Sequence, residues 1–343
     1  MTGGKPNEDA FQVKQRGSMH TRIDDVRYQL SLTGSTMARH TSVDILTVSG
    51  FLVLTFGISW GGVSLLWFLD VDLASGAGQG IGSVVFMGAP TIATIVILRF
   101  RGKSIREACG LYLGRARWII LAWIAPVGLV AVMIGVGLLL PETTITSEYS
   151  AFFLELGQSP NIAAGTIADL GSIGVPLVVL LGGFGLVLGG TVFAVAAFGE
   201  ELGWRGLLLT ELAPIGFWKV SLVTGLIWGM WHAPLILLGL QFSNEPVVGI
   251  LLMTTATVVL APVYTYLTVR ARSVLAPTVF HGSFFLGVFT SVYFAEESEL
   301  VVSPFGVVGI VAGLVGIASL VAHDRLIAEE QLTKGGPLRP WSG

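Results

Sequence analysis

The segment FGEELGWRG places Glu200, Glu201 and Arg205 together at the end of an apolar run. In an α-helix, Glu201 and Arg205 lie about 40° apart at positions i and i+4, in the order that favours an ion pair. Glu200 points about 100° away from Glu201. We therefore expect Arg205 to neutralise Glu201 in a structural ion pair and Glu200 to remain available for chemistry.

Two histidines lie in other apolar segments, His232 in LIWGMWHAPL and His281 in APTVFHGSFF. Ionisable side chains inside membrane spans are costly and usually functional. With Glu200 they could bind Zn²⁺ or another divalent metal, with water as the fourth ligand. They could also work without metal, Glu200 taking a proton from water while the imidazoles stabilise the oxyanion. Trp228, one turn before His232, would support that ring by stacking on it or limiting its rotamers.

The composition indicates a membrane protein. Of the 343 residues, 53% are hydrophobic and only 12% are charged, about half the roughly 25% charge of a water-soluble domain. The single cysteine, Cys109, excludes an intrachain disulfide and a thiol-rich metal site. We find no basic patch for nucleic acid, no phosphate-cradling loop and no tandem repeat, so the expected partners are membrane lipid and a membrane-associated protein or peptide.

Eight segments approach the length of about 20 apolar residues that crosses a bilayer. They are 45–69, 82–99, 118–140, 176–198, 217–239, 247–269, 274–294 and 303–322. We therefore expect an all-α, polytopic fold: a polar, flexible tail over 1–42, a transmembrane domain over 43–322 and a short tail over 323–343. The glycine pairs Gly185/Gly189, Gly225/Gly229 and Gly309/Gly313 predict closely packed helices.

The charge distribution predicts the orientation of these spans. With eight spans, all 19 Lys and Arg residues fall in the two tails and in the loops after the second, fourth and sixth spans. The loops on the other side carry only acidic residues among their charged ones. Because Lys and Arg concentrate on cytoplasmic loops, we expect a multi-pass protein of the cell membrane with both termini in the cytoplasm.

The chemically active residues also resemble a known family pattern. The blocks are EELGWR with Glu200, Glu201 and Arg205, WGMWH with Trp228 and His232, and HGSFF with His281. They are similar to the Glu-Glu-xxx-Arg, aromatic-xxx-His and His-xxx-Asn/Asp blocks of the CPBP family, also called the Abi or type II CAAX prenyl endopeptidase family. The resemblance covers roughly residues 82 to 322. It implies an eight-span intramembrane protease that hydrolyses a peptide bond with Glu200, His232 and His281.

Two positions depart from the family pattern. Trp228 stands where Phe is usual, and Phe285 stands where Asn or Asp is usual. The second change removes a polar group expected near the reacting centre, for which Ser283 or a backbone group could substitute. Phe285 thus favours an alternative, a non-catalytic member of the fold that acts as a binding or bacteriocin-immunity protein. A proton-coupled transporter ranks last, because the chain has no paired halves with matching broken helices.

Overall fold

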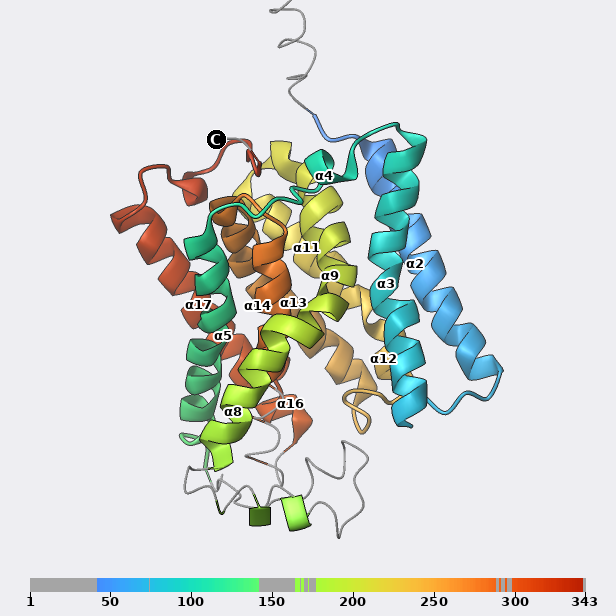
Figure 1. Cartoon of the computed structure of the whole chain (residues 1–343), viewed down its shortest axis with the longest axis vertical. Helices are drawn as coiled ribbons and strands as arrows, with labels where there is room; N and C mark the ends of the chain where they lie inside the picture. The colour runs from blue at the N-terminus through green and yellow to red at the C-terminus, as the bar shows by residue number, and fades with distance from the viewer. Residues whose placement is uncertain are drawn as a thin grey trace, which may run out of the picture. The chain divides into compact units, whose positions relative to one another are not determined.

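The computed structural model describes residues 42–73, 75–141, 177–287 and 298–341, together with 164–166, 168, 169, 172, 290 and 294. The predicted tail over 1–42 lies outside these residues except for Ser42. Residues 42–343 form one compact unit, and its helices run side by side in a bundle (Figure 1).

The helices that build the bundle are α2 (Ile45–Phe68), α3 (Gly76–Phe100), α5 (Ala116–Gly137), α8 (Leu177–Leu188), α9 (Ala194–Glu201), α11 (Phe217–Trp231), α13 (Pro246–Ala271), α14 (Leu275–Phe284) and α17 (Val307–Leu326). Short helices connect them: α4 (Ile105–Ala108), α10 (Leu209–Leu212), α12 (Ala233–Leu237) and α16 (Glu299–Val302). Two π-helical segments, η1 (Gly189–Phe193) and η2 (Leu202–Leu208), and three 3₁₀ turns, η3 (Ala213–Ile215), η4 (Phe285–Gly287) and η5 (Leu332–Lys334), complete the list.

Within the described residues, seven helical stretches are long and apolar enough to cross a membrane. They coincide with seven of the eight predicted spans, so the prediction of an all-α polytopic membrane protein is confirmed. The remaining predicted span, 274–294, contains α14 and η4, and part of its second half lies outside the described residues. The number eight therefore stays a prediction.

The fourth span differs from its predicted limits of 176–198. The helical stretch runs from Gly182 to Ile215 and carries Glu200, Glu201 and Arg205 in its interior, each at most 2% exposed. These charged residues end the apolar run in the sequence, but the backbone stays helical through them. The acidic pair thus lies inside the bundle, within a helical stretch that continues beyond it.

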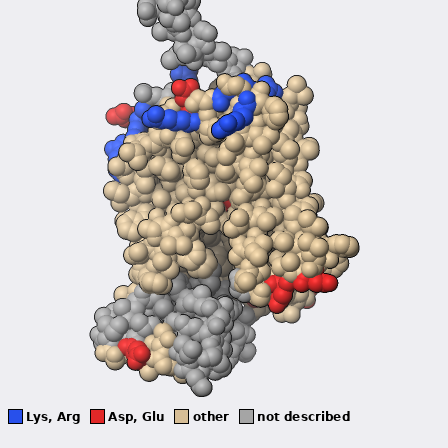
Figure 2. Space-filling model, turned by 45° about the vertical axis from the view of Figure 1, so that its right-hand side comes forward, with Lys and Arg blue, Asp and Glu red and all other residues tan. Residues whose placement is uncertain are grey.

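One end of the bundle is rich in cations. On the face shown in Figure 2, Lys and Arg gather at one end, whereas acidic residues lie at both ends. The C-terminal segment lies at the same end (Figure 1), and we call this end the basic end. The pattern agrees with the segregation of Lys and Arg predicted from the sequence.

Glycines bring α11 and α13 into close contact. A Cβ atom added at Gly225 would lie 2.6 Å from Cα of Val258, and one added at Gly229 would overlap Cα of Thr254. The hydroxyl of Thr257 donates a hydrogen bond to the carbonyl of Gly225 across the same interface, at 3.0 Å. The predicted glycine pair therefore packs one helix backbone directly on another.

We expect Gly229→Ala to destabilise the bundle, because the added methyl group has no space and overpacking typically costs about 1–3 kcal/mol. The matched control is Gly128→Ala in α5, where nothing lies within 4 Å of the added atom. Thermal unfolding of the detergent-purified protein should show a midpoint several degrees lower for Gly229→Ala and no loss for Gly128→Ala. Equal midpoints would contradict this account of the α11–α13 contact.

Candidate active site

A buried ion pair lies at the centre of the site. Nη1 of Arg205 donates to both oxygens of the Glu201 carboxylate, at 2.9 and 3.1 Å. Both side chains are almost fully inaccessible, at 1% and 0% exposure. The predicted i, i+4 pairing of Glu201 and Arg205 is therefore present in the structure, and each buried charge has its partner.

The helix changes its winding at the acidic residues. Glu200 and Glu201 are the last two residues of α9, and the π-helical segment η2 begins at Leu202 and contains Arg205. A second π-helical segment, η1, lies one short helix earlier. Such wide turns inside α-helices occur frequently at functional sites. Here they mark the segment that carries the acidic pair.

Two aromatic rings enclose the guanidinium of Arg205. Its central carbon lies 4.6 Å from the ring centre of Trp228 and 4.1 Å from that of Tyr264. Its Nε and Nη2 atoms are buried and have no hydrogen-bond partner. The electron-rich faces of the two rings take the place of hydrogen-bond acceptors for these two nitrogen atoms of Arg205. Trp228 therefore stabilises the Arg205 cation, in addition to the support of His232 that its spacing predicts.

Glu200 uses a different partner from Glu201. Its Oε2 accepts a hydrogen bond from Nε1 of Trp228 at 2.8 Å, and Arg205 makes no hydrogen bond to it. The side chain is 2% exposed and interacts electrostatically with His281 and Glu201. The two neighbouring acids thus have distinct environments, as the helical geometry predicts, and Glu200 is the carboxylate that is not held by a cation through a hydrogen bond.

Both histidines are held through Nδ1. Nδ1 of His281 lies 2.8 Å from Oε1 of Glu201, and Nδ1 of His232 lies 2.9 Å from the carbonyl oxygen of Trp228. Because a carbonyl only accepts, His232 carries its proton on Nδ1, and its Nε2 is left for other contacts. The Trp228 ring contacts both imidazoles edge to face, at centroid distances of 5.9 and 5.5 Å.

Close backbone contacts bring these elements together, and α9 lies between α3 and α14 (Figure 1). A Cβ atom at Gly282, next to His281, would lie 2.6 Å from the backbone nitrogen of Ala194 at the start of α9. A Cβ atom at Gly199, next to Glu200, would lie 2.7 Å from the carbonyl oxygen of Met87 in α3. Glycine beside each polar residue therefore lets the neighbouring helix approach closely enough to bury it.

The structure brings all six predicted site residues into one cluster: Glu200, Glu201, Arg205, Trp228, His232 and His281. One relationship was not foreseen, because His281 bonds to Glu201, the acid expected to be purely structural. Tyr264 was also missed. Its hydroxyl is buried without a hydrogen-bond partner, and its ring lies 5.8 Å from that of His281. A tyrosine within an apolar span is the only signal that the sequence offered.

Phe285, the residue at the position where the family pattern has Asn or Asp, contacts another aromatic ring. It stacks on Phe193 with ring centres 4.0 Å apart and is 37% exposed. Ser283, considered above as a substitute polar group, is fully buried, and its hydroxyl has no hydrogen-bond partner. The hydroxyls of Ser283 and Tyr264 are both unpaired, and that of Tyr264 belongs to a ring that contacts Arg205 and His281.

The geometry that bears on a metal site is that of the described residues alone. Among the described residues, no three of His, Cys, Asp and Glu come together in a way that could hold a metal ion. Burial, followed by the nearby charge of Glu211, raises the pKa of the Cys109 thiol to about 12, so it is protonated at neutral pH and is no thiolate ligand. The zinc ligand set predicted from Glu200, His232 and His281 gains no support from this geometry.

We expect Glu201→Gln to destabilise the fold strongly, because it leaves the buried Arg205 cation without its counter-charge, at about 3–5 kcal/mol. Glu200→Gln keeps an oxygen that can accept from Trp228 and should unfold within a few degrees of the wild type. The double change Glu201→Gln with Arg205→Met should recover part of the stability lost in Glu201→Gln. Thermal unfolding in detergent measures all three, and a stable Glu201→Gln single variant would refute the structural part given to this pair.

Comparison with known proteins supports the resemblance of the motif blocks. A search of curated proteins finds no match to this chain. Residues 182–287, which contain all three blocks, match the model of a protein family described as type II CAAX prenyl endopeptidase Rce1-like. The family resemblance read from the three blocks is thereby confirmed for residues 182–287, which are similar to Rce1-like type II CAAX prenyl endopeptidases.

Proposed function

We propose that this protein is an intramembrane endopeptidase that hydrolyses a peptide bond in a membrane-associated protein or peptide. The observation that supports the proposal is that the two neighbouring acids have different partners. Glu201 is neutralised by Arg205 and holds His281, whereas Glu200 has one oxygen on Trp228 and the other free of hydrogen bonds to the described residues. The family match to residues 182–287 supports the same class of reaction.

The charges of the cluster balance when His281 is protonated. Glu200 and Glu201 then face two cations, Arg205 and His281, and His281 donates through Nδ1 to Glu201. Its Nε2–H is left as a donor. Neutral His232 presents the lone pair of Nε2, since Nδ1–H donates to the Trp228 carbonyl. The two imidazoles therefore suit opposite tasks, His281 as a donor to an anion and His232 as an acceptor from water.

The reaction follows from these roles. A water molecule held by Glu200 and Nε2 of His232 loses a proton to the Glu200 carboxylate and attacks the carbonyl carbon of the scissile bond. The negative charge that forms on the carbonyl oxygen is stabilised by Nε2–H of His281. Glu200 then gives the proton to the leaving nitrogen as the C–N bond breaks, which yields a carboxylic acid and an amine and restores the carboxylate.

Buried hydroxyls offer a replacement for the polar group missing at position 285. Phe285 supplies no donor, but the hydroxyls of Ser283 and Tyr264 are buried and unpaired. A second donor to the oxyanion typically contributes about 10²–10³ in rate. In this mechanism one of these two hydroxyls completes the oxyanion site together with His281.

A non-catalytic role in the same fold is the second candidate, and Phe285 is the observation that favours it. The aromatic pair that it forms with Phe193 is apolar and partly exposed, which suits contact with a lipid or a protein partner. A binding or immunity protein of this kind would keep its function in a Glu200→Gln variant, whereas a protease would lose it.

Loss of cleavage in site variants tests the protease directly. Glu200→Gln, His232→Ala and His281→Ala should each reduce cleavage by at least about 10²-fold, since a general base alone contributes about 10²–10⁴. Mass spectrometry of membrane-protein ends should show fragments in cells with the wild type that are absent with each variant. Cleavage of a farnesylated CAAX peptide, compared with cleavage of the same peptide without the farnesyl group, then tests the substrate class.

The control is His323→Ala, because His323 contacts Tyr266 rather than the site residues. It should process the same proteins as the wild type. The protease proposal fails if the three site variants, folded and membrane-inserted, generate the same fragments as the wild type.

The mechanism through Glu200 also predicts how the activity responds to metal removal. Because the described residues provide no three-ligand site, we expect phenanthroline to leave the cleavage rate unchanged and the purified protein to hold far less than one metal ion per chain. One tightly bound ion per chain that disappears in His232→Ala would instead establish a metalloprotease.

A further inference from the structure

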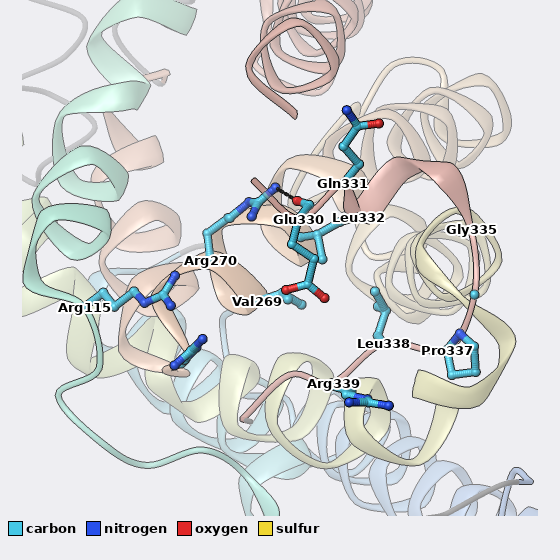
Figure 3. Close-up of a pocket in the computed structure, with 12 residues that line it drawn as sticks. Arg115, Val269, Arg270, Glu330, Gln331, Leu332, Gly335, Pro337, Leu338 and Arg339 are labelled. Atoms are coloured by element: carbon cyan, nitrogen blue, oxygen red, sulfur yellow. Dashed lines mark hydrogen bonds between the residues drawn. The ribbon is translucent and has the colours of Figure 1, made fainter. Parts of the chain in front are cut away.

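A small polar cavity opens at the basic end of the bundle, where the C-terminal segment covers the ends of α5 and α13 (Figure 3). Its volume is about 70 Å³, which is larger than the space that a single water molecule requires. The charged residues in its wall are Arg115, Arg270, Arg272, Arg339 and Glu330. Such a cavity has room for a single small anionic group.

The cations in this wall outnumber the acids. Arg270 is paired with Asp324 and also donates to the carbonyl of Glu330, so its charge is already balanced. Arg115 and Arg272 then face one carboxylate, that of Glu330. Burial and the nearby Arg272, Arg117 and Arg270 lower the pKa of Arg115, whereas Glu330 acts in the opposite sense. The wall therefore carries an excess of positive charge that a bound anion would relieve.

The arginines are held in place by the backbone. The amide of Arg115 donates to the carbonyl of Ala271 at 2.8 Å, which ties the start of α5 to the end of α13. Arg272 adopts a left-handed conformation, with φ 55° and ψ 40°, directly after α13. Glycine is the usual residue at such a position, so the arginine is kept there despite a backbone cost. Arg115 and Arg272 are thereby placed side by side.

The other wall is fastened by Asp324. Its carboxylate accepts hydrogen bonds from the amides of Leu332 and Thr333, at 3.1 and 2.9 Å, and from the Thr333 hydroxyl at 2.8 Å. It also pairs with Arg270 of α13. The buried carboxylate of Asp324 thus joins the C-terminal segment, which carries Glu330 and Arg339, to Arg270 of α13. The cavity is therefore preformed.

We propose that this arginine-lined cavity, built from Arg115, Arg272 and Arg270, is a binding site for a phosphate group. The planar guanidinium fork matches phosphate oxygens, and the cavity has room for one such group. The cavity lies at the ends of two membrane-spanning helices, which is the level of lipid headgroups. The phosphate could therefore belong to an anionic phospholipid or be free in solution.

Ligand-induced thermal shifts of the full-length, detergent-purified protein test the site. The probes are dioleoyl phosphatidylglycerol, dioleoylglycerol as the lipid without phosphate, and inorganic phosphate, with sodium chloride at matched ionic strength. We expect the phosphate-bearing lipid or inorganic phosphate to raise the midpoint, and dioleoylglycerol and chloride to leave it unchanged. A shift with the lipid alone identifies a headgroup site, and a shift with inorganic phosphate at millimolar concentration identifies a site for the free anion.

Arg115→Gln and Arg272→Asn should each raise the ligand concentration needed for the half-maximal midpoint shift by at least about tenfold, because each removes a charge-assisted contact. The Arg115 side chain makes no capping bond to α5, and Asn tolerates the left-handed conformation at 272, so both variants should fold. The matched control is Arg106→Gln, an exposed arginine of α4 that is not in the cavity wall. Equal responses in the wild type and both cavity variants, or no response to any phosphate-bearing probe, would overturn the proposal.

Discussion

The ion pair between Glu201 and Arg205 is the interaction on which the site depends. An isolated charge buried among apolar helices would cost several kilocalories per mole, so neither residue could stay inside the bundle alone. Paired at 2.9 Å, they allow one helical stretch to continue from Gly182 to Ile215. Glu200 lies in the same helical stretch, so the Glu201–Arg205 ion pair is what allows a reactive carboxylate in the interior of the bundle.

Aromatic rings and glycines complete what the ion pair begins. Trp228 serves three groups at once: its ring faces Arg205, its Nε1 bonds to Glu200 and its carbonyl accepts from His232. Glycines at 199 and 282 let α3 and α14 approach the backbone of α9. With side chains at these positions the helices would separate, and the polar groups would lose both their partners and their shielding from water.

Part of this arrangement could be predicted because it depends on local spacing. An i, i+4 acid–base pair, an i, i+4 Trp–His pair and apolar runs of bilayer length are readable from the chain, and the family match agrees with them. The end of the fourth span was misjudged for a related reason. A hydropathy pattern treats every charged residue as solvated, whereas Arg205 and Glu201 neutralise each other in the interior.

The sequence by itself determined that the chain is a polytopic helical protein, that its cations segregate to one side, and which few polar residues interrupt its apolar spans. Only the tertiary structure decided that His281 bonds to Glu201, that Tyr264 covers Arg205, and that Arg115 meets Arg272 and the C-terminal segment around one cavity. The physical reason is that hydrophobic patterning specifies which residues are buried, without direction. Hydrogen bonds and ion pairs are directional, and they join groups from helices whose relative placement no local spacing encodes.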